Sequence, residues 1–374
     1  MDIDLSEEQE FFRDTTRKFL HAESPLSRVR ELIDDTTGFD RETWAQGADL
    51  GWFSFLVPDE FGGGTLSGAP VTDLAIVAGE LGRSMFPGPV LPSNLVASAI
   101  ARSGSPGLRA EHLPSIVAGD TIATWAFAEA NDRWDAEGIE LAAVPESEGF
   151  RLSGTKTVVQ DAHVATLFLV SARTPRGLTQ FLVPATSDGV DVEPLETLDV
   201  ARRFSQIRFD NVAVDATAVV GQVDEAVDDI EYLGNLAVVL QCAESVGAAE
   251  RTFEFTLEYA QDRKAFGRPI GGFQAIKHRF AEMLGWLESA KAATAGALEA
   301  VQRGVDATEI TSIAKWHVGT HTTRVVRDCL QVHGGIGYTW EHDLHLYLRR
   351  VESNRAVLGS PEQHLDRLAA VLGI

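Results

Sequence analysis

The spacing of apolar residues divides the chain into two helical parts with a strand-rich part between them. From residue 5 to about residue 118 apolar positions recur with a helical period, which predicts helices over residues 8–20, 72–82 and 94–103. From residue 121 to 220 the pattern changes to short apolar runs rich in β-branched and aromatic residues. These runs predict strands over residues 121–127, 166–171, 180–183 and 206–209.

The helical period returns at residue 226 in much longer segments. Helices are expected over residues 226–262, 272–303, 307–333 and 361–372, and segments this long are typical of a helical bundle. The predicted fold class is therefore α+β. It has an N-terminal helical domain (1–118), a middle antiparallel β-barrel domain (119–222) and a C-terminal four-helix bundle (223–374).

Charge and composition restrict the possible partners. The chain has 55 acidic and 32 basic residues, a formal net charge of -23, which argues against nucleic acid or an anionic membrane as partner. The first residues are acidic and lack an apolar export signal, so we expect a cytoplasmic protein. Its two cysteines, Cys242 and Cys329, are far apart and fit reduced, buried thiols.

Histidine pairs are the only pattern that raises the question of a metal. His317 and His321 have i, i+4 spacing, and His342 and His345 are also close in sequence. No nearby carboxylate or cysteine has the spacing to complete a ligand set. We therefore expect no metal site.

Two motifs indicate binding of a nucleotide-like ligand. The first is Gln331-Val-His-Gly-Gly-Ile-Gly, in which Gly334 and Gly335 allow a backbone to approach a ligand closely. By itself such a run more often marks a helix end or a turn. The second motif runs from Arg263 through Phe266 to Gln274, and the planar guanidinium of Arg263 suits a pyrophosphate.

Each residue of the second motif also has a simpler interpretation. Arg263 could be a solvated cation at a helix end, paired with Asp262 or Glu258. Phe266 could be ordinary core, and Gln274 an ordinary surface residue.

Both motifs occur in the order and at the separation found in the acyl-CoA dehydrogenase family, which the chain resembles over nearly its whole length. Further similarity lies in the loop at residues 57–63 and in residues 209–221. The resemblance implies FAD as cofactor, an acyl-CoA thioester as substrate and an electron-transfer flavoprotein as acceptor. It also implies that six residues bind the FAD of a neighbouring subunit: Arg263, Phe266, Gln274, Gln331, Gly334 and Gly335.

The resemblance also exposes two departures. The family's catalytic carboxylate lies at one of two positions, which correspond here to Leu358 and Ala237, and neither residue can accept a proton. Family contacts to the flavin ring are altered too. Residues 126–134 lack the Thr-Glu-Pro and Gly-Ser pattern, and Val158 and Gln160 replace an aromatic residue and a hydroxyl donor.

Features that serve a neighbour's cofactor are thus retained, whereas those that serve the chain's own flavin ring are lost. This contrast favours a hetero-oligomer in which the chain completes the FAD site of a second, catalytically complete acyl-CoA dehydrogenase subunit. The arrangement is similar to that of the heteromeric actinobacterial enzymes of steroid side-chain degradation. The substrate would then be a steroid-derived or fatty acyl-CoA.

Two alternatives remain open. A self-sufficient homo-oligomer would need an unusual base, and Glu244 is the candidate because it lies seven residues, about two helical turns, beyond Ala237. Glu244 could equally be a structural glutamate paired with an arginine. The third possibility is a scaffold that binds no flavin, which the presence of Arg263 and Gln274 disfavours.

Overall fold

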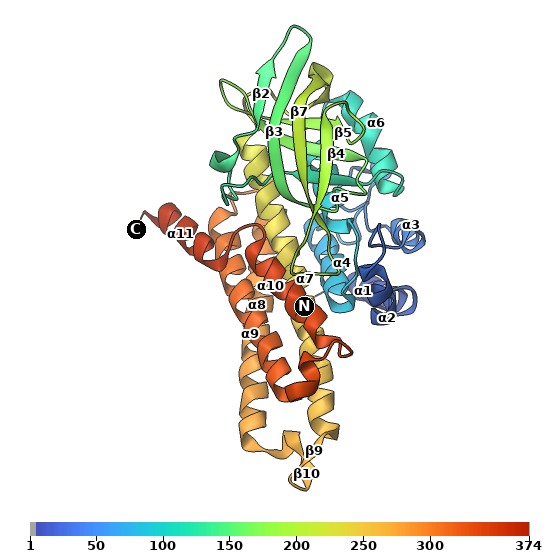
Figure 1. Cartoon of the computed structure of the whole chain (residues 1–374), viewed down its shortest axis with the longest axis vertical. Helices are drawn as coiled ribbons and strands as arrows, with labels where there is room; N and C mark the ends of the chain where they lie inside the picture. Colours follow the sequence, from blue (N-terminus) through green and yellow to red (C-terminus); the bar gives the residue numbers. More distant parts are fainter. Residues whose placement is uncertain (1–4, 374) are drawn as a thin grey trace.

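The computed structural model describes residues 5–373 and has three parts. In Figure 1 a β-sheet lies at one end, a group of N-terminal helices lies beside and below it, and a long helical bundle extends away from the sheet. The N-terminal helices are α1 (Glu7–Glu23), α2 (Leu26–Ile33), α3 (Arg41–Asp49), α4 (Pro70–Ser84), α5 (Val90–Ser103) and α6 (Pro106–Val117).

The predicted helices over residues 8–20, 72–82 and 94–103 are confirmed as α1, α4 and α5. Helix α1 begins where Ser6 and Gln9 form a reciprocal capping box. Helices α2, α3 and α6 were not predicted. The first two have only 8 and 9 residues, too few for an apolar period to stand out.

The middle part is one mixed sheet with the order β6-β7-β3-β2-β4-β5-β8, and β1 pairs with β4. The strands are β1 (Ala123–Ala126), β2 (Ala142–Pro145), β3 (Gly149–Gln160), β4 (Leu167–Arg173), β5 (Leu178–Pro184), β6 (Val190–Leu195), β7 (Phe204–Asp215) and β8 (Val219–Val220). The antiparallel expectation holds for most pairs, but β1 and β2 pair with β4 in parallel. Strand β4 is buried along nearly its whole length, as strands in parallel pairs commonly are.

Four long helices build the C-terminal part: α7 (Val227–Asp262), α8 (Gln274–Gln302), α9 (Thr308–His333) and α10 (Leu344–Ala356). A last helix, α11 (Pro361–Leu372), packs against α9. The predicted helices agree closely with α7, α8, α9 and α11. Helix α10 was missed because Arg350, a charged residue, occupies a fully buried position and breaks the apolar period.

Helices α4 and α7 cross with their backbones in contact. A Cβ atom at Gly247 would lie 2.0 Å from the Gly79 carbonyl oxygen, and one at Gly82 would lie 2.0 Å from the Glu244 carbonyl oxygen. Glycine is therefore required at this crossing, which fixes the N-terminal helices against the middle of α7.

The hairpin of β9 (Lys264–Ala265) and β10 (Arg268–Pro269) joins α7 to α8. It lies at the end of the bundle farthest from the sheet (Figure 1). Within residues 5–373, no helix has the length and apolarity needed to cross a membrane.

Candidate functional site

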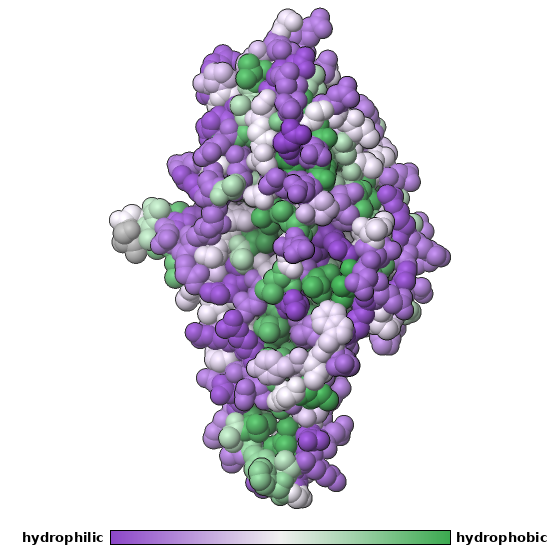
Figure 2. Space-filling view, in the orientation of Figure 1, coloured by the Kyte–Doolittle hydropathy of each residue, from purple (hydrophilic) through white to green (hydrophobic). Residues whose placement is uncertain are grey.

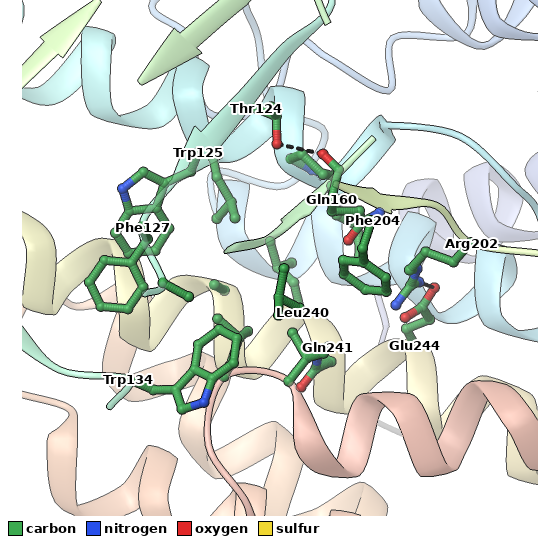
Figure 3. A pocket seen from close by; sticks show the side chains of 18 residues that line it. Thr124, Trp125, Phe127, Trp134, Gln160, Arg202, Phe204, Leu240, Gln241 and Glu244 are labelled. Atoms are coloured by element: carbon green, nitrogen blue, oxygen red, sulfur yellow. Dashed lines mark hydrogen bonds and ion pairs between the residues drawn. The ribbon is translucent and has the colours of Figure 1, made fainter. Parts of the chain in front are cut away.

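A cavity lies between the sheet, α5, α7 and the segment that follows α10 (Figure 3). Its volume is about 80 Å³. The lining residues come from six regions of the chain: Leu91, Pro92, Leu95, Thr124, Trp125, Phe127, Ala128, Trp134, Val158, Gln160, Arg202, Phe204, Ala237, Leu240, Gln241, Glu244, Val357 and Leu358.

Aromatic side chains line part of this space. Trp125 and Phe127 stack with ring centroids 4.4 Å apart, and Trp134 and Phe204 project toward the same cavity in Figure 3. Sites for organic cofactors have volumes of roughly 300 to 1,000 Å³. The remaining 80 Å³ holds a few water molecules and is too small for a tricyclic flavin ring.

Hydrogen bonds fix the loop that carries Phe127 and Trp134. The buried ammonium group of Lys156 donates to the carbonyl oxygen of Phe127 at 2.9 Å and to the carboxylate of Glu129 at 2.7 Å. Burial lowers the pKa of Lys156 to about 8, although the Glu129 charge opposes this shift. From the other side, Gln363 on α11 donates to the Asp132 carbonyl at 2.8 Å. The loop that brings Phe127 and Trp134 to the cavity is therefore anchored on both sides.

Val158 and Leu358 line the cavity in left-handed backbone conformations, with φ of 51° and 65°. This conformation is a genuine outlier for a β-branched residue such as Val158. It coincides with a shift in the pairing of β3 and β7 between Lys156 and Val159. The bulge determines which β3 side chains face the cavity.

The two positions at which a catalytic base was sought both lie on the cavity wall. They are Ala237 on α7 and Leu358 after α10, which two separate elements bring to the same space. Neither side chain can accept a proton. Gln160 also lines the cavity, and its backbone carbonyl accepts a hydrogen bond of 2.7 Å from the hydroxyl of Thr124.

Glu244 reaches the cavity from α7, but its carboxylate is already engaged. It forms an ion pair with Arg202, accepts a hydrogen bond of 3.0 Å from Nη1 of Arg350, and accepts another of 2.8 Å from Asn354. Its side chain is only 2 % exposed. Burial alone would raise the pKa of Glu244, but the charges of Arg202 and Arg350 outweigh this effect and lower the pKa to about 2.

A general base works best when its pKa lies near the working pH. A carboxylate with a pKa of about 2, held by two arginines and an amide, has little tendency to take a proton. The geometry therefore favours the structural interpretation of Glu244. No local pattern points to Arg202 or Asn354, because both come from parts of the chain distant from Glu244.

The motif from Arg263 to Gln274 lies at the far end of the bundle. Arg263 follows the last residue of α7, Gln274 begins α8, and both side chains are exposed. Phe266, in the hairpin between them, is 95 % exposed. Since Gln241 lines the cavity and Asp262 ends α7, the helical rise places this motif about 30 Å from the cavity.

The motif that begins at Gln331 lies at the same end. Gln331 is in the last turn of α9, and Gly334 and Gly335 begin the following 3-10 helix η5 (Gly334–Tyr338). A Cβ atom at Gly334 or Gly335 would meet no atom within 4 Å, so these backbones are open to a ligand. His333 stacks on Tyr259, with ring centroids 4.3 Å apart, and so brings this segment to the end of α7.

The four histidines considered for a metal site have other neighbours. His317 lies 2.8 Å from the hydroxyl of Ser289 and has its ring 4.3 Å from that of His321. Across residues 5–373 no group of three or more His, Cys, Asp or Glu side chains is placed to hold a metal ion.

Comparison with known proteins gives consistent matches along the chain. Residues 6–120, 124–212 and 235–373 match the N-terminal, middle and C-terminal domain models of acyl-CoA dehydrogenase, respectively. Acyl-CoA dehydrogenase FadE27 of Mycobacterium tuberculosis is 33% identical over 354 residues, which cover 92% of this chain and 91% of that protein. Acyl-CoA dehydrogenase IpdE2 of Mycolicibacterium smegmatis is 29% identical over 367 residues, 98% and 99% of the two chains.

Two solved structures combine sequence similarity with the same fold. A chain of the ChsE4-ChsE5 complex from Mycobacterium tuberculosis is 30% identical, with a TM-score of 0.90 and coverage of 100% of this chain and 99% of that one. A chain of a variant of the Tcur3481-Tcur3483 steroid ACAD is 28% identical, with a TM-score of 0.90 and 98% coverage of both chains.

Proposed function

Since this chain belongs to the acyl-CoA dehydrogenase family of FAD-dependent oxidoreductases, we propose that it acts as one subunit of a hetero-oligomeric acyl-CoA dehydrogenase. Its role in this proposal is to complete the FAD site of a second, catalytically competent subunit. The reaction is the α,β-dehydrogenation of an acyl-CoA thioester, with an electron-transfer flavoprotein as acceptor.

One contrast within the chain carries the proposal. The cavity that should receive the chain's own flavin ring measures about 80 Å³, and aromatic side chains form part of its wall. Both base positions on its wall, Ala237 and Leu358, are aliphatic. The motif residues at the other end of the bundle are exposed and open. A chain whose site for the flavin ring is closed and whose site for adenosine is open is suited to help bind the FAD of another subunit.

The residues of the two motifs match the chemistry of the adenosine half of FAD. Arg263 offers a planar pair of donors for the pyrophosphate, and the amides of Gln274 and Gln331 can hydrogen-bond to it or to the ribose. The backbones of Gly334 and Gly335 leave space for the adenine. In this family FAD supplies the acceptor for the β hydride. This chain would contribute binding and orientation only.

The surface of the same end is suited to contact with another chain. Figure 2 shows hydrophobic residues gathered at the end of the molecule where Figure 1 places the β9–β10 hairpin. Phe266 is 95 % exposed there. Exposed aromatic residues beside arginines are typical of the energetic centres of protein interfaces.

The proposed substrate class is the CoA thioester of a bulky, steroid-derived acyl group. Support comes from the two related structures, one of which is named a steroid ACAD while the other is a complex of two components. A fatty acyl-CoA is the alternative, and turnover assays with both thioesters distinguish them.

The test is expression of this chain alone and together with a catalytically complete acyl-CoA dehydrogenase from the same organism. We expect a colourless protein alone, and a yellow complex that oxidises an acyl-CoA after co-expression. An isolated chain that is yellow and active would overturn the proposal in favour of a self-sufficient enzyme. If this chain changes neither the flavin content of the complex nor its affinity for FAD, the chain is a scaffold instead.

Arg263→Ala in the complex tests the assigned contact. We expect the dissociation constant for FAD to rise at least about tenfold, because a bidentate contact to the pyrophosphate is lost. Lys264→Ala is the matched control, since Lys264 is the adjacent exposed cation. Equal effects of the two substitutions would reduce the contact to general electrostatic attraction and refute the specific role of Arg263.

A further inference from the structure

A single arginine of the N-terminal helices reaches the segment that follows the glycine motif. Arg30 lies on α2 and donates from Nε to Oδ1 of Asp343 at 2.7 Å. Its Nη2 lies 3.4 Å from Nε2 of His345, and its guanidinium lies 5.7 Å from the centre of the Trp340 ring. Three side chains of one segment thus converge on Arg30.

The same three side chains are also linked to one another. Trp340 and His345 stack with ring centroids 4.6 Å apart, and Nε2 of His345 lies 3.2 Å from the Trp340 carbonyl oxygen. Asp343 immediately precedes α10. Arg30 therefore holds a preformed unit at the start of α10.

This unit is connected directly to the proposed adenosine site. Trp340 is five residues beyond Gly335, and between them the chain forms a tight turn in which Thr339 N–H donates to the Ile336 carbonyl at 3.1 Å. Tyr338 in this turn is 68 % exposed. In the described part of the chain, every hydrogen bond from the N-terminal helices to residues 334–345 comes from Arg30.

From these contacts we infer that Arg30 is a positioning residue for FAD binding. Through Asp343, His345 and Trp340 it fixes the turn after Gly335, and so sets the backbone that receives the adenosine end of the partner subunit's FAD. The inference rests on the proposed function. It adds that the N-terminal domain, which has no motif residue of its own, helps to determine cofactor affinity.

The ion pair is too exposed to be a major source of global stability. The Arg30 and Asp343 side chains are 22% and 38% exposed, and ion pairs at such sites stabilise a fold only slightly. The Arg30→Ala chain should therefore fold. Its effect is expected in ligand affinity, where loss of one hydrogen bond to a charged group corresponds to about tenfold.

The experiment compares FAD dissociation constants of the hetero-oligomer with wild-type, Arg30→Ala and Arg28→Ala chains. Arg28 is the matched control, because it lies on the same helix but pairs with Asp40 and Glu31 within the N-terminal part. We expect about a tenfold weaker affinity for Arg30→Ala, less than a twofold change for Arg28→Ala, and the same melting temperature for both.

A conservative variant and a double-mutant cycle separate positioning from a general structural role. Arg30→Lys retains the charge toward Asp343 but not the planar group over Trp340, so partial recovery of FAD affinity is expected. Asp343→Asn should also weaken FAD binding. The double variant Arg30→Ala with Asp343→Asn should lose no more FAD affinity than the single variant with the larger loss. Additive losses, or equal losses in the Arg28 and Arg30 variants, overturn the inference.

The Arg263→Ala variant separates a failure of the role of Arg30 from a failure of the proposed function. If Arg263→Ala weakens FAD binding and Arg30→Ala does not, the positioning role of Arg30 is wrong and the proposed function stands. If neither substitution changes FAD affinity, the adenosine site itself is wrong.

Discussion

Arg350 and Glu244 face each other between α10 and α7, with Nη1 of the arginine 3.0 Å from Oε1 of the glutamate. Both side chains are almost completely buried, at 0% and 2% exposed. The Arg350 guanidinium also pairs with Asp199. A charged network thus lies directly behind the cavity in which the family's chemistry would take place. Among residues 5–373, it binds the only carboxylate on the cavity wall.

Substitution of Glu244 tests whether this carboxylate is structural or catalytic. Glu244→Gln should lower the free energy of unfolding by about 3 to 5 kcal/mol, because the buried Arg202 loses its counter-charge and Arg350 keeps only Asp199. Activity per folded complex should be unchanged. Chemical denaturation and steady-state turnover measure the two effects. Abolished turnover in a stably folded complex would reinstate Glu244 as a base.

Glu352→Gln is the control for that substitution. Glu352 pairs with Arg327, and the two side chains are 17% and 61% exposed, so water reaches this pair far more than the Glu244 network. We expect a change in unfolding free energy of less than about 1 kcal/mol.

The pH dependence of stability should report the same network. The pKa of Glu244 in the folded chain is about 2, below the ordinary value of 4.5. The stabilisation is therefore complete above about pH 4.5 and is lost as the pH falls from 4.5 toward 2, by an amount on the order of 3 kcal/mol. Denaturation curves between pH 6 and pH 3 should show about 2 kcal/mol of this loss in the wild type. The Glu244→Gln chain should show a correspondingly shallower decline, and parallel profiles would contradict the assignment.

Closure of the cavity depends on packed aromatic rings. Phe127 is buried and stacked on Trp125, so Phe127→Ala should cost about 3 to 5 kcal/mol of unfolding free energy. Val144→Ala, at a strand position that is 54% exposed, should change it by less than about 0.5 kcal/mol. Thermal or urea unfolding of the isolated chain provides the comparison. A Phe127→Ala chain as stable as the wild type would mean that the cavity is open in solution.

The backbone at Val158 carries strain that glycine would relieve. Its φ of 51° costs roughly 1 to 2 kcal/mol for a residue with a Cβ atom. Val158→Gly should therefore be close to neutral, whereas Val159→Gly, at a buried neighbour without positive φ, should cost more than about 2 kcal/mol. Melting temperatures of the two variants test this difference. A larger loss at Val158 would show that its side chain is held by packing.

Local sequence was sufficient to predict the long helices. It was also sufficient to identify positions whose side chains cannot act as a base. Helices α7, α8 and α9 contain enough turns for a helical period to be read directly. The incapacity of Leu358 and Ala237 as bases is a property of their side chains. The motifs containing Arg263 and Gln331 are likewise local, since each consists of residues close together in the sequence.

Only the tertiary structure decided how distant residues act on one another. The parallel pairing of β1 with β4, the position of Trp134 on the cavity wall and the contact of Arg30 with Asp343 all join segments with no common local pattern. Glu244 is the clearest case. Its sequence position allowed either a base or a structural residue, and the choice depends on Arg202 and Arg350, which lie 42 and 106 residues away. A carboxylate's pKa is set by the charges and solvent around it in space, so no local sequence pattern determines it.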